Sequence, residues 1–183
     1  MSKPISGHFS GTTGYTISNK ISSQFPTKHV KISSKTFDTR EHPTKYKQMS
    51  SKKLKALREK LNSRTITKSE YKRLSWQNRL TTRRNTAIKE FWKSEIRKIK
   101  LGLPTTRNWS AKQRQEILSG KRPTFKGKAM ASHHLYSVSK YPHLANRKEL
   151  IYPATVYEHI YGFHGGNTRK SLPGVPIRDI KEF

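Results

Sequence analysis

Residues 132–167 read SHHLYSVSKYPHLANRKELIYPATVYEHIYGFHGGN, and this stretch decides the fold. Five of the eight histidines of the chain lie between His133 and His164. Two of them are adjacent, and two more lie five residues apart in the segment HIYGFH at residues 159–164. Imidazole titrates near neutral pH and is a common ligand of divalent metals. Such a cluster therefore indicates proton transfer, metal binding or both.

The pattern around these histidines predicts two short strands followed by a helix. Residues 121–136 are typical of a loop that leads into a strand, and residues 150–154 (LIYPA) are apolar enough for a second strand. Residues 155–161 predict a short helix that Thr155 caps, with Glu158 near its positive end. The predicted order in this part of the chain is strand, loop, strand, helix.

The composition limits what kind of site can exist here. The chain has 183 residues, of which 31% are apolar, and its mean hydropathy is −0.91, so we expect one domain with a modest core. It has no cysteine, so a metal must be held by His, Asp, Glu or Asn. No apolar stretch approaches the ~20 residues of a membrane span, and residues 1–16 lack the apolar core of a signal peptide.

The net charge of the chain is strongly positive and unevenly distributed. Thirty-nine Lys and Arg against 11 Asp and Glu give +28, which predicts a polyanionic partner and above all nucleic acid. Residues 1–130 contain 32 basic and seven acidic side chains, whereas residues 131–183 contain seven and four. We therefore expect the first part to bind the partner and the second to perform the chemistry.

Helices dominate the basic part. Residues 51–62 have leucines at helical spacing, and Thr67-x-x-Glu70 is a capping box that begins a helix through Lys100. Ser110-x-x-Gln113 begins a shorter helix that ends near residue 120. Residues 1–48 predict irregular structure or a small hairpin.

Several cations are candidates for contacts with nucleic acid. On the long helix these are Arg79, Arg83, Arg84 and Lys93, and beyond the C-terminal glycines Arg169 either contacts phosphate or is solvated. Trp76 and Trp92 either stack on bases or belong to the core, and their helical spacing favours the core. The remaining histidines, among them His42 and His143, are expected to be polar or structural residues.

This arrangement resembles the ββα-metal nucleases, the HNH or His-Me finger superfamily. The resemblance covers roughly residues 105–175 and is strongest to the HNH/endonuclease VII nucleases at the C-termini of bacterial polymorphic toxins. The motifs that carry it are Trp109, Ile117-Leu118-x-Gly120, Gly127, His133-His134, Ser137-Val138, Tyr141-Pro142-x-Leu144-Ala145, Pro153-Ala154-Thr155, Glu158-His159 and His164-Gly165-Gly166-Asn167. The resemblance implies an α+β fold in which a basic, mainly helical region (residues 1–104) precedes a ββα-metal core (residues 105–183).

The resemblance also implies roles for the histidines. His134 matches the general base, and His133, just before it on the strand, matches a ligand of one divalent metal ion such as Mg²⁺, Mn²⁺, Zn²⁺ or Ni²⁺. His159 is the best further ligand, and Glu158 either adds a carboxylate or orients His159. His164 is either a third ligand or a phosphate-binding or structural residue, because residues five apart on an α-helix point about 140° apart.

One position departs from the superfamily pattern. An asparagine that braces the loop of the general base commonly stands at the start of the second strand, where this chain has Leu150. Either Asn146 or a backbone carbonyl takes over this task, or the base is held differently.

The resemblance implies a metal-dependent endonuclease, with DNA preferred over RNA as the substrate. It further implies the toxic C-terminal module of a larger secreted protein, which acts in the cytoplasm of a target cell and is neutralised by an acidic immunity protein. The alternative is a non-enzymatic nucleic-acid-binding protein with a structural metal on its histidines. The clustering of histidines in the least basic part of the chain favours the enzyme.

Overall fold

The computed structural model describes residues 37–44 and 46–180. Most of the segment predicted as irregular structure or a small hairpin lies outside the described residues. The described part combines helices with two small antiparallel sheets, which confirms the predicted α+β class. Within it, no helix is both long enough and apolar enough to cross a membrane.

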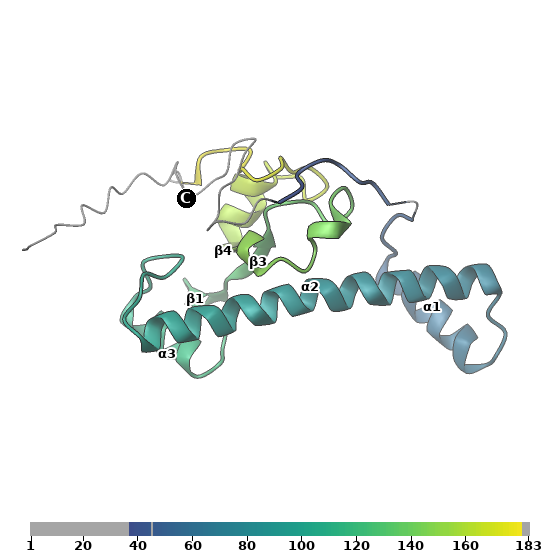
Figure 1. Cartoon of the computed structure of the whole chain (residues 1–183), viewed down its shortest axis with the longest axis horizontal. Coiled ribbons are helices and arrows are strands. Elements are labelled where there is room, and N and C mark those ends of the chain that lie inside the picture. The colour runs from purple at the N-terminus through teal and green to yellow at the C-terminus, as the bar shows by residue number, and fades with distance from the viewer. Residues whose placement is uncertain (1–36, 45, 181–183) are drawn as a thin grey trace, which may run out of the picture.

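Two helices form a hairpin at one end of the molecule (Figure 1). Helix α1 (Ser51–Asn62) begins where the Ser50 hydroxyl accepts from the Lys53 amide, and α2 (Lys68–Lys100) begins at the reciprocal capping box of Thr67 and Glu70. Both predicted ranges are confirmed. Met49, Leu57 and Leu74 pack together and join α1 to the first turns of α2.

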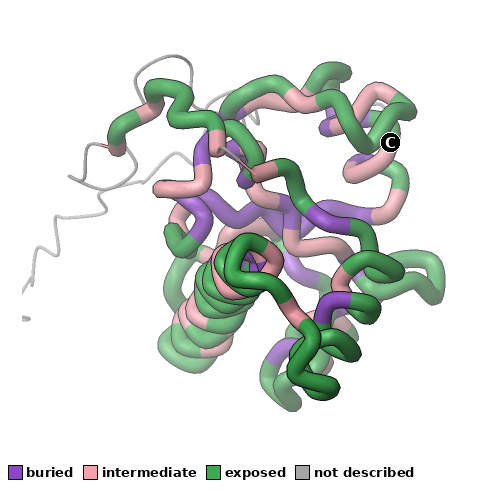
Figure 2. Tube along the Cα trace, turned by 90° about the vertical axis from the view of Figure 1, so that its right-hand side faces the viewer, coloured by how far each residue is buried: buried purple, intermediate pink, exposed green. Residues whose placement is uncertain are grey.

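Helix α2 is the scaffold on which the rest of the chain packs. Its 33 residues extend over about 50 Å at 1.5 Å per residue. Leu80 packs against Val138 and Ala145, and Phe91 packs against Ile151. In Figure 2, which looks along α2, the buried residues gather between this helix and the C-terminal part of the chain. Both Trp76 and Trp92 pack on these clusters, which confirms that they are core residues.

The far end of α2 holds a short helix and a hairpin. Helix α3 (Ala111–Leu118) begins at a capping box of Ser110 and Gln113, as predicted. It leads into β1 (Thr124–Phe125) and β2 (Lys128–Ala129), which pair around a turn with positive φ angles at residues 126 and 127.

A buried carboxylate fixes this end of the molecule. Glu95 of α2 is fully buried and accepts hydrogen bonds from the Trp109 indole at 2.9 Å and from the Thr106 amide at 3.1 Å. Burial raises the pKa of Glu95, but hydrogen bonds from Lys98, Trp109 and Thr106 outweigh it and keep the pKa below its usual range. The carboxylate therefore stays ionised and ties the loop after α2 to the helix.

The histidine-rich stretch forms the second sheet and the element after it. Strands β3 (Ala131–His134) and β4 (Ile151–Ala154) are antiparallel, with His133 opposite Tyr152 and His134 opposite Ile151. The connection between them contains the 3-10 turns η2 (Pro142–Leu144) and η3 (Lys148–Leu150). The sheet lies over the C-terminal third of α2, where Phe91 packs against Ile151 (Figure 1).

The helix after β4 differs from the prediction. Only residues 156 and 157 are α-helical, and the π-helix η4 (Glu158–Phe163) follows them. The cap is present as predicted, since the Thr155 hydroxyl accepts from the Glu158 amide at 3.2 Å. The division of the chain between residues 104 and 105 stays a prediction.

Candidate active site

Three histidines from two elements meet in one cluster. His133 comes from β3, His159 from η4, and His164 directly follows η4. One ring nitrogen of each lies within 4.8 Å of the others. The ring centroids are 5.2 Å apart for His133 and His159, 5.2 Å for His133 and His164, and 4.8 Å for His159 and His164. The structure thus brings together all three residues predicted as metal ligands.

The π-helical turn explains how His164 reaches the cluster. On an α-helix, residues five apart point about 140° away from each other. A π-helix is wider, with i→i+5 hydrogen bonds, so residues five apart lie on roughly the same side. His159 and His164 have this spacing, and η4 covers the residues between them. Gly165 and Gly166, both with positive φ, then turn the chain away.

The hydrogen bonds of His164 leave one nitrogen available. Its Nδ1 lies 2.5 Å from the carbonyl oxygen of Lys170. A carbonyl can only accept, so Nδ1 carries the proton and Nε2 keeps its lone pair. Metal-bound histidines are typically held by such a bond from the other ring nitrogen.

The cluster favours neutral imidazoles. Burial, followed by the neighbouring rings of His159 and His164, lowers the pKa of His133 to about 3. Burial and His164 likewise lower the pKa of His159. His133 also stacks on Phe163, with centroids 4.2 Å apart. Since the unprotonated ring binds metals, these shifts favour metal binding at neutral pH.

His134 points away from the three-histidine cluster, as neighbouring strand residues do. Its Nε2 lies 3.3 Å from the carbonyl oxygen of Ala145 and can only donate to it, which leaves Nδ1 as a proton acceptor. Burial, and then the positive charge of Arg84, lower the pKa of His134 to about 4. The ring is therefore neutral at pH 7 and held in one orientation.

The Ala145 carbonyl replaces the missing asparagine. Of the two predicted substitutes, Asn146 instead accepts a hydrogen bond from Arg83 at 3.2 Å. Leu150, at the position of that asparagine, is buried, and its carbonyl accepts from the Leu135 amide at 2.9 Å. A backbone oxygen thus orients His134 where the superfamily pattern has a side chain.

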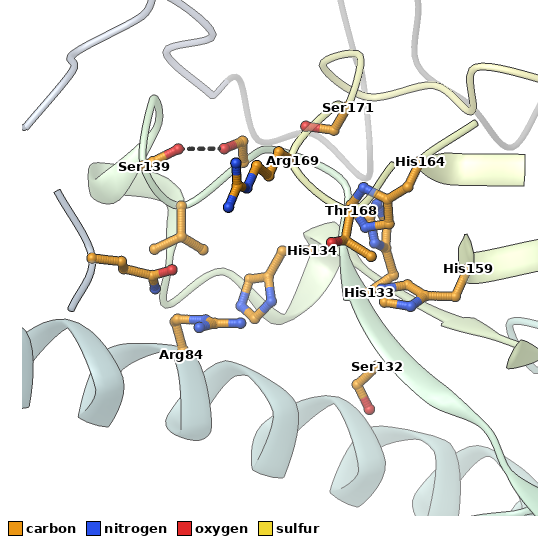
Figure 3. A pocket seen from close by; sticks show the side chains of 13 residues that line it. Arg84, Ser132, His133, His134, Ser139, His159, His164, Thr168, Arg169 and Ser171 are labelled. Atoms are coloured by element: carbon orange, nitrogen blue, oxygen red, sulfur yellow. Dashed lines mark hydrogen bonds between the residues drawn. The ribbon is translucent and has the colours of Figure 1, made fainter. Parts of the chain in front are cut away.

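One cavity of about 480 Å³ connects these groups. His133, His134, His159 and His164 line it, and Figure 3 shows Arg84 reaching from α2 toward His134. The other lining residues are Gln48, Ser132, Ser137, Val138, Ser139, Thr168, Arg169 and Ser171. A cavity lined by four imidazoles and by the guanidinium groups of Arg84 and Arg169 suits a phosphate group bound next to a metal.

The five predicted phosphate-binding cations do not form one surface. Arg84 and Arg169 line the cavity, and Arg84 is partly buried, with a guanidinium Nε that has no partner within the described part of the chain. Arg83 instead donates to the His143 carbonyl at 3.0 Å, and Lys93 pairs with Glu90 at 2.9 Å. Arg79 is exposed outside the cavity lining.

Glu158 lies outside the cavity, contrary to the expectation that it ligates a metal or orients His159. Its carboxylate is buried and accepts from both terminal nitrogens of Arg107, at 2.7 and 2.8 Å. It also accepts from the Thr155 amide at 2.6 Å, so Thr155 and Glu158 form a capping box. The physical reason is that this carboxylate caps the turn before η4 and neutralises a partly buried arginine.

Sequence reasoning missed Arg107 and Gln48. Arg107 also donates to the Pro153 carbonyl at 3.0 Å and so joins the loop after α2 to the end of β4. The sequence TVYE at residues 155–158 has the capping-box pattern and could have identified the role of Glu158. Nothing in the sequence near Arg107 indicates its partners, because its contacts join distant segments. Nothing near Gln48 indicates that it lines the cavity.

Comparisons with known proteins agree with the motifs. Residues 74–155 match the family model Tox-GHH, described as a GHH signature containing HNH/Endo VII superfamily nuclease toxin. This confirms the predicted resemblance, and this part of the chain is similar to a nuclease toxin domain. The chain has Ser132 before the two histidines, where the named signature has glycine. No curated protein and no solved structure matches the chain.

The matched residues contain His133 and His134 but end before the other two histidines of the cluster. The assignment of His159 and His164 to the site is therefore supported by the geometry of η4 and not by the family match. Ser132, in the place of the signature glycine, accepts a hydrogen bond from the Trp92 indole at 3.0 Å and so joins β3 to α2.

Proposed function

We propose that the protein is a metal-dependent endonuclease in which β3, β4 and η4 form a ββα-metal unit. The observation that carries this proposal is the arrangement on β3. His133 faces two further imidazoles, while His134, the next residue, enters the same cavity with a free Nδ1 and a fixed ring. The match of residues 74–155 to a nuclease toxin family supports the same reaction class.

His133, His159 and His164 would hold the metal. The donor set fits, since it offers three ring nitrogen atoms, and burial lowers the pKa of His133 and His159. Nitrogen ligands suit Zn²⁺ or Ni²⁺ better than Mg²⁺ or Mn²⁺, which prefer oxygen. When bound, the ion supplies Lewis acidity at the scissile phosphate and stabilises charge on the leaving oxygen.

The side chains on the other side of the cavity carry out the proton transfer. Nδ1 of His134 accepts a proton from water as the water oxygen attacks phosphorus. The Ala145 carbonyl keeps the opposite nitrogen protonated and the ring in place. Arg84 and Arg169 bind phosphate oxygens, so the nucleic-acid strand would cross the cavity between α2 and the loop after η4.

DNA is the proposed substrate in preference to RNA. The chain is proposed to be the toxic module of a larger secreted protein. The net charge of +28 supports a polyanionic substrate, and the nuclease toxin family supports the toxin role. The same charge suits an acidic immunity protein, which electrostatic attraction would bring rapidly to the surface. The place of action would be the cytoplasm of the target cell.

A nucleic-acid-binding protein with a structural metal is the second candidate. A structural site would account for His133, His159 and His164, but not for His134 and Arg84 beside it in an accessible cavity. The two candidates differ in one measurable respect, because only the enzyme cleaves.

The test incubates purified protein with plasmid DNA and with total RNA, in separate reactions with Mg²⁺, Mn²⁺, Zn²⁺, Ni²⁺ or EDTA. The expected result is cleavage that requires a divalent ion, is strongest on DNA and is abolished in His134→Ala. Metal-independent cleavage, or binding to both nucleic acids without cleavage under any condition, would overturn the proposal.

A further inference from the structure

A second group of potential metal ligands lies outside the catalytic cavity. Asp38 and His42 come from the segment before α1, and His143 comes from η2. One ligand atom of each lies within 4.8 Å of the others. The rings of His42 and His143 meet edge to face, with centroids 4.6 Å apart. None of the three residues lines the cavity or belongs to the first histidine cluster.

The backbone holds these two segments together. The His42 amide donates to the Lys140 carbonyl at 2.9 Å, and the Thr44 amide donates to the Ser139 carbonyl at 3.4 Å. Lys140 also pairs with Glu41 at 2.9 Å. In Figure 1 the segment from residue 37 runs beside the loop that connects β3 and β4. These contacts bring together residues that are separated by about a hundred positions in the sequence.

One ring nitrogen of His143 is held by a hydrogen bond, which leaves the other as an acceptor. Its Nε2 lies 2.8 Å from the backbone carbonyl of Asp38, and because a carbonyl only accepts, Nε2 carries the proton. The lone pair of the ring is therefore on Nδ1. This Nδ1 is buried and has no hydrogen-bond partner among the described residues. A buried acceptor without a donor is costly, and a cation would satisfy it.

The other two side chains complete a donor set. His42 Nε2 lies 3.1 Å from Asp38 Oδ2, so an imidazole and an ionised carboxylate already adjoin each other. Arg40 now contacts the same carboxylate, with Nε 2.9 Å from Oδ1 and Nη2 3.0 Å from Oδ2. The Arg40 side chain is 82% exposed, so moving its guanidinium off one oxygen costs little.

We propose that Asp38, His42 and His143 form a second metal site, which binds a Zn²⁺-type ion. Two imidazoles and one carboxylate leave one position for water in a tetrahedral site, which is a common zinc arrangement. The nitrogen donors disfavour Ca²⁺ and Mg²⁺, which take oxygen ligands.

The second ion would hold the segment before α1 against the loop that connects β3 and β4. His143 lies two residues before Ala145, whose carbonyl contacts His134. This link through the metal ion would therefore stabilise the loop that orients His134. This consequence for catalysis rests on the proposed function, whereas metal binding at the second site does not.

The experiment counts metal ions on the 183-residue chain without a histidine tag. Metal-free protein is titrated with Zn²⁺ against a chromogenic chelator, and Co²⁺ absorption reports the coordination of each site. Wild type is expected to bind two ions. His42→Gln and Asp38→Asn are each expected to bind the second ion at least ~10-fold more weakly, while His159→Gln/His164→Gln loses only the first.

Matched variants distinguish loss of the second site from a general loss of metal binding or of folding. Glu59→Gln on the exposed surface of α1 should keep both ions, and Arg40→Gln should keep or strengthen the second, since it removes a competitor for Asp38. His42 is more than half exposed, so a protein with His42 replaced should keep the wild-type circular dichroism spectrum. This holds even if replacing His143 disturbs the fold. If His42→Gln and Asp38→Asn bind Zn²⁺ as wild type does, the second site does not exist. Loss of cleavage alone would not overturn it.

Discussion

The stretch around β3, β4 and η4 and the long helix α2 carry their functional groups in different ways. The first has seven basic and four acidic residues in positions 131–183, and its chemistry is concentrated in a few imidazoles. The second belongs to the part with 32 basic and seven acidic residues, where cations occur along the whole length of the helix. Rare residue types at short spacing locate a site, whereas abundant charge locates only a partner.

The largest expected effect tests whether the histidine region performs chemistry. His134→Ala should lower the cleavage rate by roughly 10²–10⁴-fold or more, because it removes the proton acceptor and little else. DNA affinity at matched salt and the number of bound metal ions should stay as in wild type. The measurement is single-turnover cleavage with metal and DNA in excess. A variant that cleaves at the wild-type rate would assign the base elsewhere.

The second prediction tests whether Glu158, in the same region, stabilises the fold or takes part in the chemistry. Glu158→Gln leaves Arg107 without its counter-ion in a largely buried place, and breaking such a pair costs about 3 kcal/mol of unfolding free energy. Urea unfolding measures this loss, and Glu59→Gln on the exposed surface of α1 is the matched control.

The activity of the folded variant then decides between the two roles of Glu158. If Glu158 only supports the fold, cleavage per folded molecule should remain within a few-fold of wild type at low temperature. A large loss of cleavage without a loss of stability would return Glu158 to the catalytic site.

The features that local sequence determines were predictable, and those that distant contacts determine were not. Capping boxes marked the starts of α2 and α3, and adjacent histidines marked β3. The same local logic left the role of His164 open between a ligand and a phosphate-binding or structural residue, because an α-helical repeat was assumed where η4 is π-helical. It failed at Glu158, because a carboxylate beside a histidine resembles a ligand, while its partner Arg107 lies 51 residues away.

Acid should destabilise the metal-free protein through the buried histidines. The folded state keeps His134 neutral down to about pH 4, whereas the unfolded chain takes up this proton near 6.5. Between these values the unfolded state binds more protons, so stability falls as the pH decreases. His133, with a pKa of about 3, adds to the same trend.

The measurement for this trend is urea unfolding with EDTA at about pH 7.5 and about pH 5. His134→Gln should reduce the loss of stability between the two by roughly 1–2 kcal/mol. Equal losses in both proteins would mean that His134 titrates normally in the folded state.

The smallest expected effect concerns the basic helix and shows which of its charges face nucleic acid. Arg84 reaches into the cavity, whereas Lys93 is paired with Glu90 on the exposed surface. Each phosphate contact contributes roughly 0.9 to the slope of log K against log salt concentration on duplex DNA. Arg84→Gln should therefore reduce the slope by about 0.9 and weaken binding to all sequences, while Lys93→Gln should leave the slope unchanged. Filter binding between about 50 and 200 mM salt, the range over which such slopes are measured, gives both values.

Arg79→Gln reports whether the bound nucleic-acid strand continues along α2, because Arg79 is exposed and lies outside the cavity lining. If Lys93→Gln flattens the slope as much as Arg84→Gln, the nucleic acid covers the outer surface of the helix, and the division between a cavity that binds the scissile phosphate and a solvated helix is wrong.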